Sequence, residues 1–131
     1  MRLLLDTHVW IWSLLEPTRL GRRALSALRN RRSELWLSPV STWEFLILVE
    51  RGRVQIDAPP EDWLRDAMER APLREAPLTH EIALASRSVD LPHDDPADRF
   101  LAATARVLDL TLVTADRRMM RSRSFSVLPA N

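Results

Sequence analysis

Arg2-Leu3-Leu4-Leu5-Asp6-Thr7, near the start of the chain, sets the architecture that the rest of the sequence follows. Its leucines form a continuous apolar run instead of an alternating one, which is typical of a strand buried on both faces of a parallel sheet. The run stops at Asp6, and helix signals begin directly after it. The segment therefore predicts a strand that leads into a helix, with an acidic side chain where the chain leaves the sheet.

Strands and helices alternate along the remaining sequence. Short apolar runs predict strands, and apolar residues at helical spacing predict the helices between them, with Pro39 at one helix start and Gly52 at its end. The later strands are predicted at 35–37, 73–76, 110–113 and, at one edge, 126–128. The helices are predicted after Asp6-Thr7 and at 22–31, 39–51, 61–70, 79–88 and 97–108.

This alternation predicts an α/β fold, a three-layer sandwich whose central, mostly parallel sheet of four to five short strands is flanked by helices. A length of 131 residues with 46% hydrophobic residues indicates one domain, residues 1–131, with a real core. Ligands of such sheets bind beyond the carboxyl ends of the strands. We expect both Asp6 and Asp116 at that edge.

The composition narrows the possible sites. The chain has no cysteine, so a metal would be held by oxygen or by one of the three histidines. All 19 basic residues are arginine, but the net charge of +1 does not by itself indicate a nucleic-acid partner. Nothing at the amino terminus resembles a signal peptide, and no apolar run approaches the ~18 residues of a membrane span. We therefore expect a cytoplasmic protein with no membrane association.

Four acidic residues stand where predicted elements begin or end, and each has a structural alternative. Asp6 and Asp116 could cap the helices that follow their strands. Ser41-Thr42-Trp43-Glu44 matches a capping box, although Ser38-Pro39 is the better helix start. The four acids are Asp6, Glu44, Asp98 and Asp116.

The third acid lies in Asp95-Pro96-Ala97-Asp98, which also reads as a helix start. Asp95 is expected to be the cap. Asp98 shares a helix face with Leu101 and Ala105, so its side chain is expected to point toward the packed side. The doubled Asp94-Asp95 leaves the choice of the third acid open, and whether Asp95 contributes to the site stays open with it.

The combination outweighs the separate alternatives, because the sheet edge would bring the four carboxylates together. Two carboxylates 4 Å apart repel by roughly 4 kcal/mol at an effective dielectric constant of about 20. Either shared protons or a hard divalent cation relieves this repulsion. A site of oxygen ligands suits Mg²⁺ or Mn²⁺, and such ions activate water and stabilise the charge that develops when a phosphodiester is cleaved. The pattern therefore predicts a nuclease.

Four segments together resemble the PIN domain and, more narrowly, the VapC-type toxins of bacterial toxin–antitoxin pairs. The resemblance covers essentially the whole chain, with the acids in the family's order. It implies a PIN-like fold, a Mg²⁺- or Mn²⁺-dependent endoribonuclease acting on RNA, a homodimer, and a cognate antitoxin that blocks the site. Operator DNA would be bound only through that antitoxin. The segments are residues 3–9, 41–44, 95–105 and 112–116.

The resemblance also assigns roles to side chains. Metal-site roles fall on the four acids, with Asp98 chosen as the third because the alanine-rich helix after it matches the family, and Thr114 is expected to be a polar neighbour.

His8 could approach a substrate phosphate, although we expect it to be partly buried. Arg99 could orient an acid or contact phosphate, and a structural role is favoured for it. His93, in the loop before Asp98, could touch the site.

The tryptophans receive structural interpretations. Trp10, Trp36, Trp43 and Trp63 have apolar neighbours and are expected in the core or in a dimer contact. Trp12 could be exposed, and an exposed Trp12 could stack on an RNA base, although such stacking is not the favoured interpretation.

Two other classes of function remain as alternatives. One is a non-catalytic PIN-like regulatory module that binds an antitoxin and, through it, operator DNA. The other is a phospho-acceptor receiver domain, which also places acids at strand ends but needs a lysine, and this chain has none. Carboxylate-dependent binding of Mn²⁺ would separate the nuclease from the regulatory module.

Overall fold

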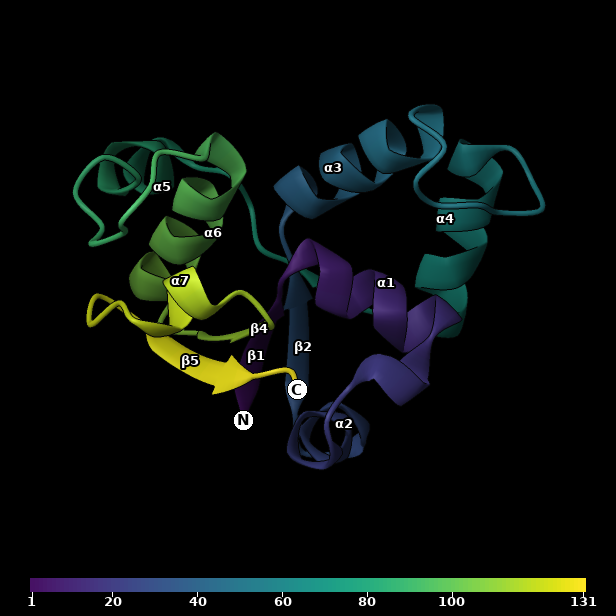
Figure 1. Ribbon diagram of the computed structural model, residues 1–131, viewed down its shortest axis with the longest axis horizontal. Helices are drawn as coiled ribbons and strands as arrows, with labels where there is room; N and C mark the ends of the chain where they lie inside the picture. The colour runs from purple at the N-terminus through teal and green to yellow at the C-terminus, as the bar shows by residue number, and fades with distance from the viewer.

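The computed structural model describes residues 1–131, and its centre is a five-stranded sheet in the order β3-β2-β1-β4-β5 (Figure 1). Every neighbouring pair of strands is parallel, so the predicted α/β fold is confirmed. The strands are β1 (Arg2–Leu5), β2 (Glu34–Leu37), β3 (Arg74–Glu75), β4 (Thr111–Thr114) and β5 (Ser126–Pro129). The helices are α1 (Thr7–Leu15), α2 (Arg22–Arg29), α3 (Pro39–Glu50), α4 (Pro60–Arg70), α5 (His80–Ala85), α6 (Pro96–Val107) and α7 (Arg117–Met120), with a 3₁₀ helix at Pro17–Arg19.

Strand β1 lies in the middle of the sheet and is buried on both faces, as its leucine run predicts. Leu3 and Leu5 belong to one hydrophobic core, and Leu4, which points the opposite way, belongs to the other. Hydrogen bonding to β2 on one side and β4 on the other fixes the register of β1, with Leu5 opposite Val113. The next residue along the chain, Asp6, is therefore held in a fixed position at the carboxyl end of β1.

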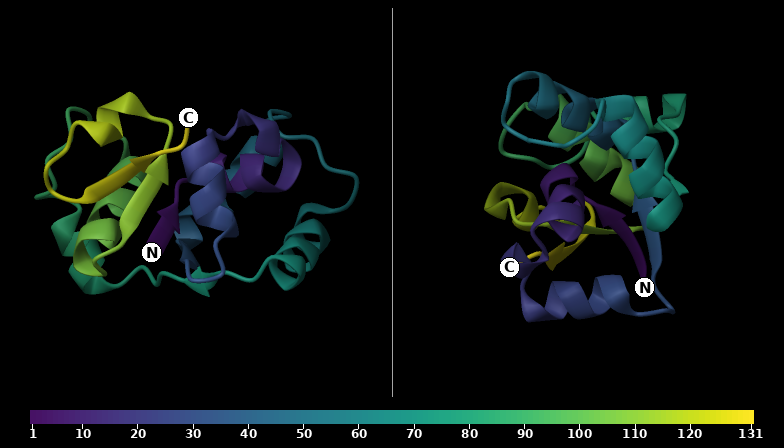
Figure 2. Two further views of the ribbon diagram at one scale, coloured as in Figure 1. Left: turned by 90° about the horizontal axis from the view of Figure 1, so that it is seen from below. Right: turned by 90° about the vertical axis from the view of Figure 1, so that its right-hand side faces the viewer.

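The helices divide between the two faces of the sheet. Buried side chains of α1, α2, α3 and α4 fill the core that contains Leu3, and those of α5, α6 and α7 fill the core around Leu4. Figures 1 and 2 show α1, α3 and α4 on one side of the sheet and α5, α6 and α7 on the other. None of the helices is both long enough and apolar enough to cross a membrane.

Helix α3 corrects one prediction. The sequence pattern suggested that Trp43, Ile47 and Leu48 share the buried stripe with Val40, but Phe45 is the fully buried side chain and Trp43 is 58% exposed. Ser38 caps this helix, which confirms the preferred start. Because α3 carries apolar residues on nearly all of its sides, its spacing alone cannot identify the face that meets the core.

The other tryptophans lie at different depths. Trp10 is buried, as predicted, and it packs against Phe45, which in turn stacks on the half-buried Trp63. Trp12 is half-buried: it packs against the core, and the guanidinium of Arg19 lies 4.3 Å from the centroid of its ring. Trp43 is not in the core, and its part in a dimer contact stays a prediction.

Candidate metal centre

Two of the four acids stand at the carboxyl ends of neighbouring strands. Asp6 directly follows β1, and Asp116 lies two residues after the end of β4. Each also caps the next helix: Asp6 accepts a hydrogen bond from the backbone N–H of Thr7 at 2.7 Å, and Asp116 accepts one from that of Arg118 at 2.9 Å. Capping and membership of the cluster therefore coexist, since a helix start is also where a parallel strand delivers its ligands.

A threonine joins these two acids. The hydroxyl of Thr114, the last residue of β4, donates to Asp6 Oδ2 at 2.6 Å and accepts from the backbone N–H of Asp116 at 3.0 Å. Thr114 is fully buried, so this link is shielded from water. The structure thus places Thr114 as the polar neighbour that the resemblance assigns.

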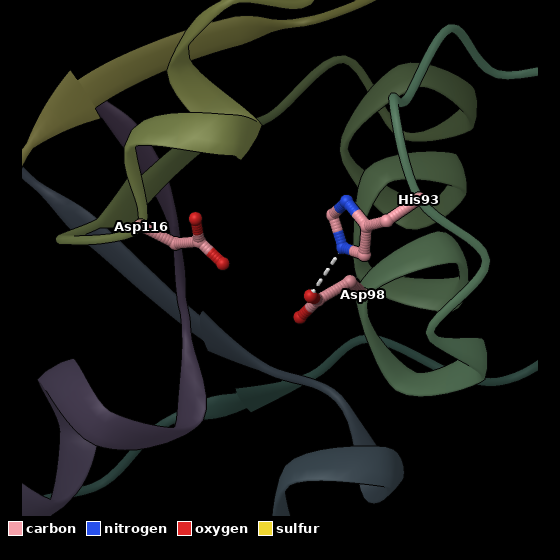
Figure 3. Close-up of side chains that lie close together, drawn as sticks. All are labelled: His93, Asp98 and Asp116. Carbon is pink, nitrogen blue, oxygen red and sulfur yellow. Dashed lines mark hydrogen bonds and ion pairs between the residues drawn. The ribbon is translucent and has the colours of Figure 1, made fainter.

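Asp98 reaches the site from the first turn of α6. Asp95 caps that helix through the backbone N–H of Asp98, as predicted, and Oδ2 of Asp98 lies 2.8 Å from Nε2 of His93. The other ring nitrogen of His93 is buried without a hydrogen-bond partner, so the contact with Asp98 is the polar contact of this imidazole. Figure 3 shows His93 and Asp98 together, facing Asp116 across the site.

Glu44 enters from the middle of α3 through Thr7. The Thr7 hydroxyl is hydrogen-bonded to Glu44 Oε1 at 2.5 Å and to Ser41 Oγ at 2.9 Å, while its backbone N–H holds Asp6. Thr7 is therefore the connection between the first two acids of the sequence. Its position directly after a strand-ending acid is the signal that sequence reasoning passed over.

The acids influence one another. Asp98, Asp116 and His93 each offer one ligand atom, and these three atoms lie within 4.8 Å of one another. Burial raises the pKa of Asp6, and the charge of Asp98 raises it further. Burial likewise raises the pKa of Glu44, with added repulsion from Asp6 and Asp98. All four carboxyl groups therefore belong to one electrostatic cluster.

The pKa values of Asp98 and Asp116 are shifted in opposite directions. Burial raises the pKa of Asp98, and repulsion by Asp95 and Asp116 adds to the effect. The hydrogen bond from the Arg118 side chain lowers the pKa of Asp116. Asp116 is thus the acid of the cluster that a positive side chain already stabilises as an anion.

The donor set fits a hard divalent cation. Asp98, Asp116 and His93 form a group of close ligand atoms, whereas Asp6 and Glu44 stand outside that group. Repulsion among the four acids, and the burial of three of them, favour a positive charge at the centre. Mg²⁺ and Mn²⁺ accept such ligands, and Mn²⁺ also accepts an imidazole nitrogen such as that of His93.

The secondary candidates lie in different places. His8 is exposed, not partly buried, but it is close enough to lower the pKa of Asp6 slightly. Arg99 is buried, and its guanidinium donates to the backbone carbonyls of Ser86, Val89 and His93. Arg99 therefore has a structural role, but not the one considered from the sequence: its donors fix the loop that carries His93 and do not orient an acid of the site.

Comparison with known proteins gives concordant matches. Residues 3–124 match the PIN domain family. Ribonuclease VapC22 of Mycobacterium tuberculosis is 37% identical over 123 residues, which is 92% of this chain and 91% of that protein.

Several solved structures share the fold. VapBC2 from Rickettsia felis bound to a DNA fragment from its promoter has a TM-score of 0.74 at 13% identity, over 100% of both chains. DNA-bound VapBC from Salmonella typhimurium has a TM-score of 0.68 at 17% identity, over 100% of this chain and 99% of that one. FitAcB from Neisseria gonorrhoeae has a TM-score of 0.62 at 21% identity, over 96% of each.

Proposed function

The chain belongs to the PIN domain family, and from this premise we propose that it is an endoribonuclease that uses Mg²⁺ or Mn²⁺ and acts as the toxin of a toxin–antitoxin pair. One observation carries the proposal. Asp98, Asp116 and His93 offer ligand atoms within 4.8 Å of one another. The charge of Asp98 acts on both Asp6 and Glu44, and burial raises the pKa of Asp6, Glu44 and Asp98. Such a cluster costs stability unless it serves to bind positive charge.

The acids, threonines and arginines around the site have different roles in the proposed reaction. Asp6, Glu44, Asp98 and Asp116 would hold the cation, which when bound polarises the phosphodiester and lowers the pKa of water. The hydroxyl groups of Thr7 and Thr114 hold Glu44 and Asp6 in place. Exposed arginines after Asp116 would position the RNA backbone, because a guanidinium binds phosphate with its planar fork. These are Arg117, Arg121 and Arg123.

The relatives support the choice of partners. The solved structures of similar fold include VapBC assemblies that contain DNA, one of them a promoter fragment. We extend this arrangement to the present chain: a cognate antitoxin covers the acid cluster and connects the toxin to operator DNA. RNA is then the substrate, and DNA is contacted through the antitoxin.

Replacement of Asp98 by alanine tests the catalytic part. We expect cleavage of a fluorogenic RNA with Mn²⁺ to fall at least about 100-fold, because changes in the surroundings of metal ligands alone cost 10–100-fold. Asp94→Ala is the matched control, since Asp94 lies in the loop just before α6, is 78% exposed and stands outside the cluster. Circular dichroism confirms that both variants are folded. Cleavage by Asp98→Ala at the wild-type rate would leave the non-catalytic regulatory module as the better interpretation.

A homodimer is part of the proposal, and Trp43 is its best marker. This exposed side chain lines an apolar groove between α3 and α6 together with Leu78, Pro96 and Phe100. Exposed apolar surface of this kind commonly marks a protein interface. Trp43→Ser is expected to shift the protein toward the monomer in light scattering while its circular dichroism spectrum is unchanged. An unchanged mass would place the interface elsewhere.

A further inference from the structure

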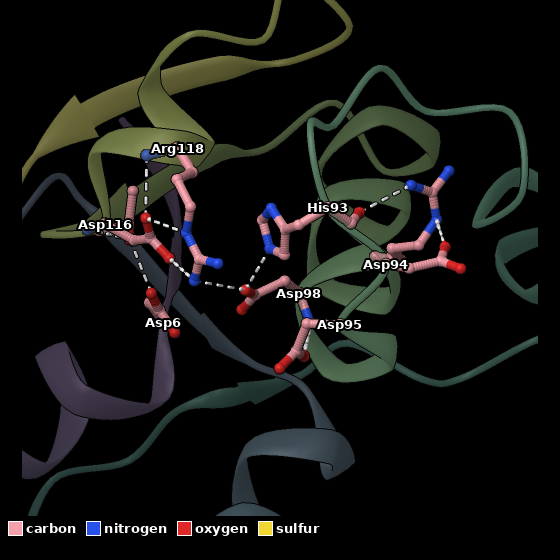
Figure 4. A network of polar contacts seen from close by, with 9 residues as sticks. Asp6, His93, Asp94, Asp95, Asp98, Asp116 and Arg118 are labelled. Carbon is pink, nitrogen blue, oxygen red and sulfur yellow. Dashed lines mark hydrogen bonds and ion pairs between the residues drawn. The ribbon is translucent and has the colours of Figure 1, made fainter.

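The guanidinium of Arg118 spans two acids of the cluster. Its Nε lies 3.2 Å from Oδ1 of Asp116, and its Nη2 lies 2.9 Å from Oδ2 of Asp116 and 3.8 Å from Oδ2 of Asp98. Asp116 precedes α7, whereas Asp98 belongs to α6, so a single side chain connects the two sides of the site. Figure 4 shows the guanidinium between the two carboxylates.

These contacts involve the oxygens that a cation would need. Both oxygens of Asp116 face Arg118, and Oδ2 of Asp98 faces both Arg118 and His93. A carboxylate oxygen can accept more than one partner, but a guanidinium and a divalent cation on the same oxygens repel each other. Arg118 must therefore move when a cation takes Asp116 and Asp98.

The side chain of Arg118 is placed so that it can move. It is 54% exposed, and its contacts with the acids are made by the end of a long, flexible chain. The backbone N–H of Arg118 holds Asp116 Oδ1 independently, so α7 keeps its cap when the guanidinium leaves. Displacement thus costs the ion pairs of Arg118 with Asp116 and Asp98 and leaves the helix start unchanged.

We propose that Arg118 is a built-in competitor of the divalent cation: its guanidinium neutralises Asp116 and Asp98 until a cation displaces it. This inference rests on the proposed metal centre. The competition raises the concentration of Mg²⁺ or Mn²⁺ that is needed to fill the site. Neighbouring arginines cannot replace Arg118, because Arg117 is exposed and makes no ion pair, and the guanidinium of Arg99 is occupied by backbone carbonyls.

Calorimetric titration with MnCl₂ tests the inference without any RNA. We expect Arg118→Gln to bind Mn²⁺ about two- to fivefold more tightly than the wild type, which is the range that a partly exposed ion pair conveys. Arg117→Gln is the matched control, since it removes one charge from the same helix without removing a contact with the acids. Arg118→Lys should lie between the two, because an ammonium group keeps the charge but loses the fork.

Thermal unfolding gives a second measurement on the same proteins. In EDTA, Arg118→Gln should melt below the Arg117→Gln variant, and saturating Mn²⁺ should raise its melting temperature by more. If Arg118→Gln binds Mn²⁺ no more tightly than Arg117→Gln, Arg118 is not a competitor, although the metal centre stands. If wild type and Arg118→Gln both bind no Mn²⁺, the metal centre itself is refuted, and this inference with it.

Discussion

The carboxyl ends of β1 and β4 deliver an aspartate to the same edge of the sheet, yet the two carboxylates are held in opposite electrostatic states. Asp6 is 9% exposed, its oxygens accept from Thr7 and Thr114, and burial raises its pKa. Asp116 is more accessible, and Arg118 lowers its pKa. The two aspartates therefore occupy equivalent positions in the sheet, but their pKa values are shifted in opposite directions.

This difference shows that position at the edge of a parallel sheet sets where an acid lies, while its immediate neighbours set its charge. The neighbours of Asp6 are uncharged hydroxyl and amide donors, which cannot offset the loss of water. Asp116 has a guanidinium within hydrogen-bond distance. A bound cation therefore stabilises the ionised carboxylate of Asp6 more than that of Asp116.

The largest expected effect comes from replacing each acid by its amide. Asp6→Asn and Asp116→Asn should both lose at least about 100-fold in RNA cleavage, since each removes a proposed metal ligand. Their effects on stability in EDTA should have opposite signs. Asp6→Asn should raise the melting temperature, because it removes a buried charge, and Asp116→Asn should lower it, because Arg118 loses its partner. A lower melting temperature for Asp6→Asn would contradict the assignment of Asp6 as a strained buried anion, because asparagine keeps the helix cap.

Thr114→Val cuts the link between the two acids and should have an intermediate effect. It removes the donor to Asp6 and the acceptor for the backbone N–H of Asp116. We expect a loss of about 1–3 kcal/mol in the free energy of unfolding, because buried polar groups lose their partners. Cleavage at limiting Mn²⁺ should fall roughly tenfold. Thr111→Val on the same strand is the control, measured by urea unfolding, and equal losses in the two variants would remove any special role for Thr114.

The pH dependence of stability separates the two states of the acids. Asp6, Glu44 and Asp98 have raised pKa values, so their contribution to stability is present below the ordinary carboxyl values of 3.8 and 4.5 and is lost as the pH rises through the raised values. The lowered pKa of Asp116 acts in the opposite sense, and its contribution is lost as the pH falls below 3.8.

In EDTA, the free energy of unfolding should therefore decrease as the pH is raised from about 4 toward neutrality, and Mn²⁺ should reverse the decrease. Urea unfolding across this range provides the measurement. The decrease should be smaller for Asp6→Asn than for the wild type. Stability that rises through this window in EDTA would contradict the assignment of three strained acids.

Asp95 gives the smallest expected effect and a reference for both strand ends. It also caps a helix, but it is exposed and stands outside the group of atoms formed by His93, Asp98 and Asp116. Asp95→Ala should cost about 1 kcal/mol through the lost cap, and Asp95→Asn should restore most of it. Both variants should keep RNA cleavage close to the wild-type rate. A large loss of cleavage in Asp95→Asn would add Asp95 to the metal site.

The sequence was sufficient for the order of strands and helices and for the edge of the sheet that Asp6 and Asp116 share. Continuous leucines predicted the central strand, and the parallel arrangement then required Asp6 and Asp116 to share an edge. The capping roles of Ser38 and Asp95 also followed from local chemistry. These features depend on residues close together in the chain, or on rules of sheet topology.

Features that depend on packing between distant elements were not predictable in this way. Phe45, and not Trp43, faces the core, because helix α3 is apolar on most sides and the position of α1 decides which face is covered. The roles of Thr7 and Arg118 depend on side-chain directions at two turns. The sequence suggested that His93 could touch the site, but not that the guanidinium of Arg99 fixes the loop that brings His93 to Asp98.

The division of β1 between two cores has a further consequence. Leu3 and Leu5 serve one core and Leu4 the other, so a slip of one residue would exchange all three leucines between environments and carry Asp6 away from Thr114. A chain with β1 in the wrong register would then be inactive as well as unstable. For an enzyme proposed to be toxic to its own cell, this ties potency to completed folding, and nascent or damaged molecules would be harmless.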